Sequence, residues 1–214
     1  MEYLLKTEGV KIINNHRAGN LPEWNIPAVI QIEDTKESVF DIVDTKDNIS
    51  SIVCLQNTGD ATYYNGLGTV YHLRFIKYEE FLNQFRISDN GIISDWAKDI
   101  ARPDYICYTV DEKKYFIIHE LSKGEISSKR KKARTQLVNC IQFLKKSNII
   151  SEWIAQFEKR LCFVSAHGCV EATPNKMADA FNNIYDYLPD PLPLKCITFE
   201  RNNYCAYETK VVKL

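Results

Sequence analysis

The sequence predicts a mixed α/β protein of the α+β type, because three kinds of pattern follow one another along the chain. Short β-type runs separated by turn residues fill the segment from residue 10 to about 75. A hairpin pattern spans residues 104–121, and the clearest helical pattern follows from residue 128 to about 146. Strands grouped early and then mixed with helices are typical of this class.

The composition is that of a globular protein without a membrane anchor. Of the 214 residues, 45% are hydrophobic and 26% are charged, and the formal net charge is −1, which excludes disordered and fibrous classes. No apolar run approaches the roughly 20 residues of a membrane helix, and the first residues lack a signal-peptide pattern, so a cytoplasmic protein is expected. The seven cysteines show no CxxC spacing, and buried free thiols are expected.

The first third of the chain has the pattern of an antiparallel meander. Its apolar runs are separated by clusters of Gly, Pro, Asn and Asp. The expected strands are VKII (residues 10–13), AVIQI (28–32), SVFDIV (38–43), SSIVCL (50–55) and TVYHLRF (69–75). We assign residues 1–75 to an N-terminal β-rich region, either a separate unit or a part of the same domain as residues 76–214.

Helices and strands alternate in the rest of the chain. The pattern predicts short helices over residues 78–85 and 93–101, the second of which ends because a residue before proline is disfavoured in a helix. The helix from residue 128 carries apolar residues at i, i+4, i+8 and i+11, namely Ala133, Leu137, Ile141 and Leu144. The remaining expected elements are a helix (151–160), a buried strand (161–167), a helix (173–188) and two final strands joined near residues 201–203.

Two carboxylates stand at the open end of the predicted hairpin. Because side chains alternate along a strand, Glu120 shares a face with Phe116, whereas His119 points the other way. A three-residue loop at 111–113 places Asp104 directly opposite Glu120, and a two-residue loop breaks this pairing. In the first register the like charges repel unless a cation lies between them, and the expected cation is Mg²⁺ or Mn²⁺.

A basic segment follows the acidic pair. Residues 123–134 contain six Lys or Arg residues and one Glu. Lys129, Lys132 and Gln136 recur at i, i+3 and i+7, which puts them in one stripe beside the apolar face of the helix. Their donor groups suit phosphate oxygens, and a helix packed on the hairpin would direct part of this stripe toward the two acids.

These residues resemble the motif of the PD-(D/E)XK nuclease superfamily, whose members have the restriction-endonuclease-like fold. The resemblance lies in the PD dipeptide that ends at Asp104, in IIHELSK with Glu120, and in the basic helix with Gln136. It covers roughly residues 93–168 and implies an αβββαβ core with a central mixed sheet flanked by helices. The implied site consists of the metal ligands Asp104 and Glu120, the motif lysine Lys123, and a basic helix in which Lys129, Arg130 and Gln136 bind nucleic acid.

One departure from the family concerns its lysine. The family places this lysine two residues after the second acid, and Ser122 occupies that position here. Three explanations stay open: a bulge at Gly124 rotates Lys123 back toward the site, Lys132 reaches in from the helix as a substitute, or the site is degenerate.

Structural explanations compete with the catalytic one. Glu120 could form an ion pair with a helix lysine, and Asp104 after a proline is a common turn residue. His119 is expected to be a core residue, and His167 a structural residue at a strand end. The glycine turn at residues 65–68 matches neither phosphate-binding pattern.

The expected function is a metal-dependent nuclease, with DNA as the expected substrate. A restriction or defence endonuclease acting as a homodimer is the form that this hypothesis favours. The cation would activate a water, the lysine would orient the nucleophile, and the basic helix would make binding depend on salt. The alternative is a catalytically inactive nuclease-like protein that binds nucleic acid or a protein partner, and Ser122 favours this alternative.

Overall fold

A seven-stranded mixed sheet forms the centre of the molecule. Its strand order is β1-β5-β8-β9-β10-β12-β11, antiparallel from β1 to β9 and parallel from β9 to β12. The strands are β1 (Ile32–Thr35), β5 (Leu73–Lys77), β8 (Tyr105–Thr109), β9 (Tyr115–Ser122), β10 (Lys159–Ala166), β11 (Leu192–Pro193) and β12 (Cys205–Glu208). The computed structural model describes residues 1–17, 27–44, 51–55, 59–66, 68–85, 88–89, 92–93, 102–122, 126–166 and 191–214.

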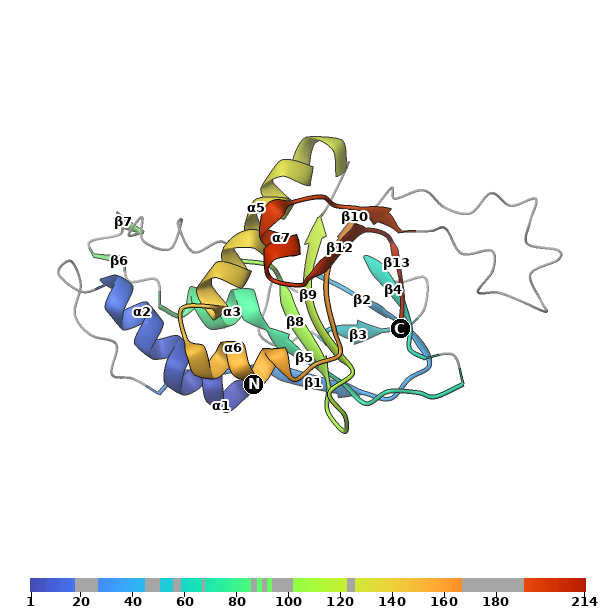
Figure 1. Ribbon diagram of the computed structural model, residues 1–214, viewed down its shortest axis with the longest axis horizontal. Helices are drawn as coiled ribbons and strands as arrows, with labels where there is room; N and C mark the ends of the chain where they lie inside the picture. Colours follow the sequence, from blue (N-terminus) through green and yellow to red (C-terminus); the bar gives the residue numbers. More distant parts are fainter. Residues whose placement is uncertain are drawn as a thin grey trace.

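A smaller sheet with the order β13-β4-β2-β3 covers one face of the large sheet (Figure 1). Its strands are β2 (Val39–Ile42), β3 (Val53–Cys54), β4 (Ala61–Tyr64) and β13 (Val211–Lys213), and β13 pairs with β4 in parallel. Aromatic rings fill the space between the sheets: Phe40 stacks on Tyr63 at a centroid distance of 5.2 Å, and both rings meet Phe75 edge to face. A separate two-stranded ribbon joins β6 (Ser88–Asp89) to β7 (Ile92–Ile93).

Helices cover the other face of the large sheet, so the molecule has three layers (Figure 1). The helical segments are α1 (Glu2–Leu4), the π-helical turn η1 (Leu5–Gly9), α2 (Val10–Arg17), α3 (Tyr78–Asn83), α5 (Ile126–Leu144), α6 (Asn148–Ala155) and α7 (Ile197–Arg201). No helix in the described segments is long and apolar enough to cross a membrane.

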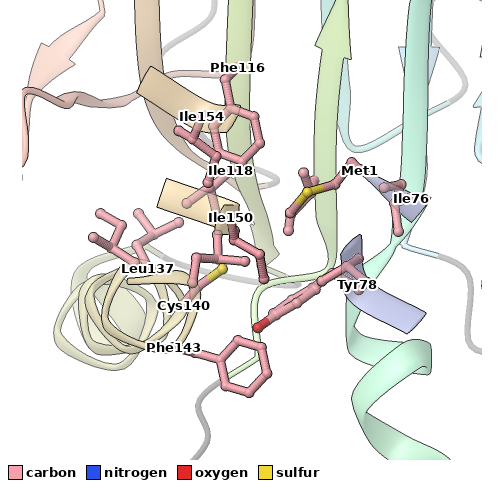
Figure 2. Packing of buried hydrophobic residues seen from close by; sticks show 14 of the residues in the cluster. Met1, Ile76, Tyr78, Phe116, Ile118, Leu137, Cys140, Phe143, Ile150 and Ile154 are labelled. Atoms are coloured by element: carbon pink, nitrogen blue, oxygen red, sulfur yellow. The ribbon is translucent and has the colours of Figure 1, made fainter. Parts of the chain in front are cut away.

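The central strands are largely apolar because both of their faces are covered. In β9, Phe116 and Ile118 belong to the core beneath the helices, whereas Tyr115 and Ile117 belong to the core between the sheets. Figure 2 shows Leu137 and Cys140 of α5 directed toward Ile118. The predicted apolar stripe of α5 is confirmed, since Ala133, Leu137, Ile141 and Leu144 are all buried.

The hairpin, the long helix, the second helix and the strand after it are confirmed, with shifted boundaries. Strands β8 and β9 pair antiparallel, α5 packs on them, and β10 lies beside β9 in parallel. The expected helix over 78–85 is α3. Three buried free thiols are also found among the described cysteines, at Cys107, Cys140 and Cys162.

Several other expectations are wrong. Residues 10–13 belong to helix α2, because buried Leu5, Ile12 and Ile13 have helical spacing and face the core. Residues 61–64, which lie between the expected strands at 50–55 and 69–75, form β4. The first of the two expected final strands is helix α7, which buries Phe199. The N-terminal strands do not form one meander either, since β1 and β5 join the large sheet and β2, β3 and β4 the small one.

The expected helices over 93–101 and 173–188 fall on residues that the structure describes little or not at all. Lys123 and His167 also lie outside the described residues, and of Lys129 only the backbone is described.

Candidate metal centre

The β8–β9 hairpin has the register that brings the two candidate acids together. Tyr105 of β8 is the direct partner of His119 of β9. Continuing this register by one residue places Asp104 opposite Glu120, as the three-residue loop predicts. The predicted register is therefore confirmed, and the two-residue alternative is excluded.

Glu120 lies on the helix-covered face of the large sheet. Phe116 and Ile118, which precede it at alternate positions, belong to the core beneath α5, and Ile117 belongs to the opposite face. The carboxyl group is largely removed from water, because Glu120 is only 8% exposed. Such a position is costly for a charge without a partner.

Asp104 is fixed by backbone groups from two elements. Its Oδ2 accepts a hydrogen bond from the Leu121 N–H at 2.5 Å. Its carbonyl oxygen accepts from the N–H groups of Tyr78, at 2.9 Å, and Glu79, at 3.3 Å, at the start of α3. Asp104 therefore joins the beginning of α3 to the end of β9, and its carboxylate has little freedom to turn away from Glu120.

Two buried oxygens at this place lack a hydrogen-bond donor among the described residues, Glu120 Oε2 and Gln136 Oε1. The Gln136 side chain is anchored by its other end, because Nε2 donates to the Arg102 carbonyl at 2.7 Å. Buried acceptors without donors are rare in folded proteins. A cation, a water or a proton on the carboxyl would satisfy them.

Burial and nearby negative charges raise the pKa of both acids. Burial raises the pKa of Glu120 to about 10, and the charges of Asp104 and Glu79 add to this rise, against the Gln136 amide and the Lys132 charge. Burial also raises the pKa of Asp104 well above its usual range, although the Leu121 N–H acts in the opposite direction. A cation that binds this pair must therefore displace protons.

The donor set fits a hard divalent cation. Within the described segments, no group of three or more His, Cys, Asp or Glu side chains is placed to hold a metal. Mg²⁺ does not require one, since it is commonly bound by one or two carboxylates and keeps several waters or phosphate oxygens. Asp104 and Glu120 could hold Mg²⁺ or Mn²⁺ in this way, with Oε2 of Glu120 available as a ligand.

The candidate basic residues separate into different roles. Lys132 is exposed on α5, and its charge lowers the pKa of Glu120, so it lies on the side of the acids. Arg130 instead forms an ion pair with Glu208 of β12, with Nε to Oε2 at 2.6 Å and Nη2 to Oε1 at 3.0 Å. Ser122, at the position of the family lysine, is buried at the end of β9.

Replacing Arg130 with Met is expected to destabilise the fold, because Glu208 is buried and would lose its bidentate partner. The expected loss in the free energy of unfolding is about 1 to 3 kcal/mol, since Arg130 itself is half exposed. Urea denaturation would measure it. The double variant Arg130→Met/Glu208→Gln should recover part of the loss, and an unchanged midpoint in the single variant would exclude this structural role.

His119 belongs to a separate buried hydrogen-bond chain between the two sheets. Ser165 Oγ donates to the Thr209 carbonyl, at 2.5 Å, so it must accept from His119 Nε2, at 2.8 Å. His119 Nδ1 then accepts from the Tyr63 hydroxyl at 2.7 Å. Burial lowers the pKa of His119 to about 3, which agrees with the neutral ring that this chain requires. The expectation of a core histidine is confirmed.

Two further acids near the pair were not predicted from the sequence. The charges of Asp44 and Glu79 both raise the pKa of Asp104. Asp44 follows β2, and Glu79 lies in the first turn of α3. Acids are common at both kinds of position, and no local pattern indicates which strand end or helix start lies beside the hairpin.

No family model matches the chain, and no curated protein or solved structure is significantly similar to it. The geometry and chemistry of the acidic pair are thus the basis for a functional proposal.

Proposed function

We propose that the protein is a metal-dependent nuclease that hydrolyses phosphodiester bonds, with DNA as the preferred substrate class. The observation that carries the proposal is the pairing of partly buried Asp104 with buried Glu120 across the open end of a hairpin. Neighbouring acids whose pKa values are raised by burial and by each other's charge are typical of functional sites.

The order of elements supports the proposed relation to the PD-(D/E)XK superfamily. Strands β5, β8 and β9 are consecutive antiparallel neighbours, α5 crosses over, and β10 returns parallel to β9. This order is consistent with the βββαβ part of the core that the resemblance implies, with α3 and the β6–β7 ribbon inserted between the first two strands.

The chain's own residues have distinct tasks in the proposed reaction. Asp104 and Glu120 bind the cation, the Leu121 N–H orients one carboxylate, and Gln136 lies against the other. A bound Mg²⁺ supplies a more acidic water and neutralises charge on the phosphate. Lys132 provides a positive charge near the acids and is the lysine candidate within the described residues.

A cleavage assay tests the proposal directly. Plasmid and single-stranded DNA would be incubated with the wild-type protein in Mg²⁺ or Mn²⁺. The Glu120→Gln and Asp104→Asn variants would be assayed in parallel. Cleavage that requires the cation and both acids supports the nuclease. Equal cleavage by wild type and both variants would indicate a contaminant and remove the support for this function.

The second candidate is a catalytically inactive nuclease-like protein that binds nucleic acid or a protein partner. Ser122 at the lysine position and the near-complete burial of Glu120 favour it. DNA binding without cleavage, unchanged by Glu120→Gln, would support this alternative over the nuclease.

Replacing Lys132 with Ala is expected to weaken DNA binding and to reduce the slope of log K against log salt by about 0.9, because one phosphate contact is lost. Binding would be followed by fluorescence anisotropy at several salt concentrations. Lys36→Ala, in a surface ion pair with Asp111, is the matched control. An unchanged slope would show that Lys132 does not contact phosphate.

A further inference from the structure

The first half of helix α5 is exposed on three sides. Figure 1 shows the beginning of this helix extending beyond the end of strand β9. From Arg130 to Thr135, only Ala133 is buried. The larger buried side chains of α5 start at Leu137, so the second half of the helix packs on the core and the first half presents most of its surface to solvent.

This exposed surface carries positive charge and no acid. Residues 126–146 contain seven Lys or Arg residues and no Asp or Glu. Lys131, Lys132 and Arg134 are exposed, and they make no ion pair with any residue that the structure describes. Their charges are therefore available to an anionic partner outside the chain.

The cations are distributed around the helix and not gathered on one side. Lys132 lies on the flank of the acidic pair, since its charge lowers the pKa of Glu120. Arg134 follows Arg130 by one turn and shares its flank, on the side of strand β12. Lys131 lies between these two flanks, because successive residues of a helix are about 100° apart around its axis. The partner must therefore contact two opposite flanks and the surface between them.

Side-chain bonds on both flanks fix the position of α5. Arg130 forms its bidentate ion pair with Glu208 on one flank. Gln136 Nε2 donates to the Arg102 carbonyl at 2.7 Å on the other. The cations are thus presented by a helix that is already held in place, which reduces the entropy lost on binding.

We propose that the first half of α5 enters the major groove of double-stranded DNA, with Lys132 and Arg134 beside phosphates of opposite strands and Lys131 facing the base edges. A helix with its side chains is about 10 to 12 Å across, and the major groove of B-form DNA is about 12 Å wide. The strand beside Lys132 then lies next to the acidic pair.

Other nucleic acids fit this helix less well. A single strand would follow one flank only, and the major groove of an RNA duplex is too narrow to admit side chains. The inference rests on the proposed function for DNA as the substrate. It adds that the substrate is a duplex and that α5 is the element that enters it.

Fluorescence anisotropy with a short DNA duplex in EDTA tests the proposal, because binding is then measured apart from cleavage. With the duplex, Arg134→Ala should reduce the slope of log K against log salt by about 0.9, as expected for one lost phosphate contact. With one of the separated strands, the same variant should leave the slope unchanged. Lys146→Ala removes one charge near the other end of α5 and is the matched control, for which both slopes should stay the same.

A duplex with a filled groove tests entry into the groove. DNA whose cytosines carry glucosylated hydroxymethyl groups has a blocked major groove and should bind much more weakly than unmodified DNA. Netropsin occupies the minor groove and should leave the affinity unchanged. Lys131→Glu should weaken binding of the unmodified duplex, and thermal unfolding would confirm that each variant is folded.

Three results would overturn the proposal: equal affinity for the duplex and its separated strands, equal affinity for the blocked and the unmodified duplex, or an unchanged duplex slope in Arg134→Ala. The cleavage assay is decided separately, by Asp104 and Glu120. Cleavage together with any of these results would leave the nuclease and remove α5 from the groove. Groove binding without cleavage would do the reverse.

Discussion

Replacing Glu120 with Gln is expected to abolish metal-dependent cleavage and to stabilise the cation-free protein at alkaline pH. The loss of a metal ligand should remove several kcal/mol of transition-state stabilisation, or about three orders of magnitude in rate. The gain in stability arises because Gln is nearly isosteric with Glu but cannot ionise.

The direction of the pH effect follows from the raised pKa of Glu120. The carboxyl group titrates at about 10 in the folded protein, against 4.5 as its ordinary value. Its contribution to stability is therefore fully present below pH 4.5 and is lost as the pH rises through 10, because the unfolded chain releases the proton first. At pH 8 the Gln variant should be more stable than wild type by about 1 to 3 kcal/mol.

Urea denaturation at several pH values, with and without Mg²⁺, would measure this effect. Mg²⁺ should stabilise the wild type increasingly as the pH rises, and it should stabilise the variant much less. Glu80→Gln, at a partly exposed position of α3, is the control and should leave both measurements unchanged. A wild-type protein that gains no stability from Mg²⁺ or Mn²⁺ at pH 8 would contradict a metal site at the pair.

Replacing His119 with Ala is expected to cost about 3 to 5 kcal/mol of stability. The change leaves a cavity between the two sheets, and it removes the partners of the Tyr63 hydroxyl and Ser165 Oγ. Ser165→Ala and Tyr63→Phe should each cost less, about 1 to 2 kcal/mol, because each leaves the ring in place.

The same histidine predicts a loss of stability in acid. Its pKa falls from 6.5 to about 3 on folding, so its contribution is fully present above pH 6.5 and is lost as the pH falls toward 3. His119→Gln should be less stable than wild type at pH 7 but should lose less stability between pH 6.5 and 3. His72→Ala, which breaks only surface contacts with Asp34 and Asp111, should cost under about 1 kcal/mol and serves as the control. A similar loss in the His72 and His119 variants would contradict a special role for the buried chain.

The sequence predicted the hairpin and α5 because local patterns determine them. Strict alternation fixed which side chains share a face in β9, and a three-residue loop fixed the position of Asp104 relative to Glu120. The apolar stripe of α5 fixed its buried face in the same way.

Elements whose conformation depends on distant packing were predicted poorly. The run ITFER has β-forming residues, yet residues 197–201 form one short helix that inserts Phe199 beneath the helices. Glycines at positions 59 and 66 suggested a turn, but the residues between them form β4 because Tyr63 packs between the sheets. The neighbours of Asp104 at Asp44 and Glu79 were missed for the same reason, since they come from separate segments.

The parallel pairing of β4 with β13 has a consequence for how the chain folds during synthesis. Thr62 pairs with Val211, so the small sheet joins segments from opposite ends of the sequence. Such a contact closes a very long loop and forms slowly. Until β13 emerges from the ribosome, β4 has an open edge and Tyr63 lacks part of its cover, which makes this strand the expected site of chaperone binding or aggregation in nascent chains.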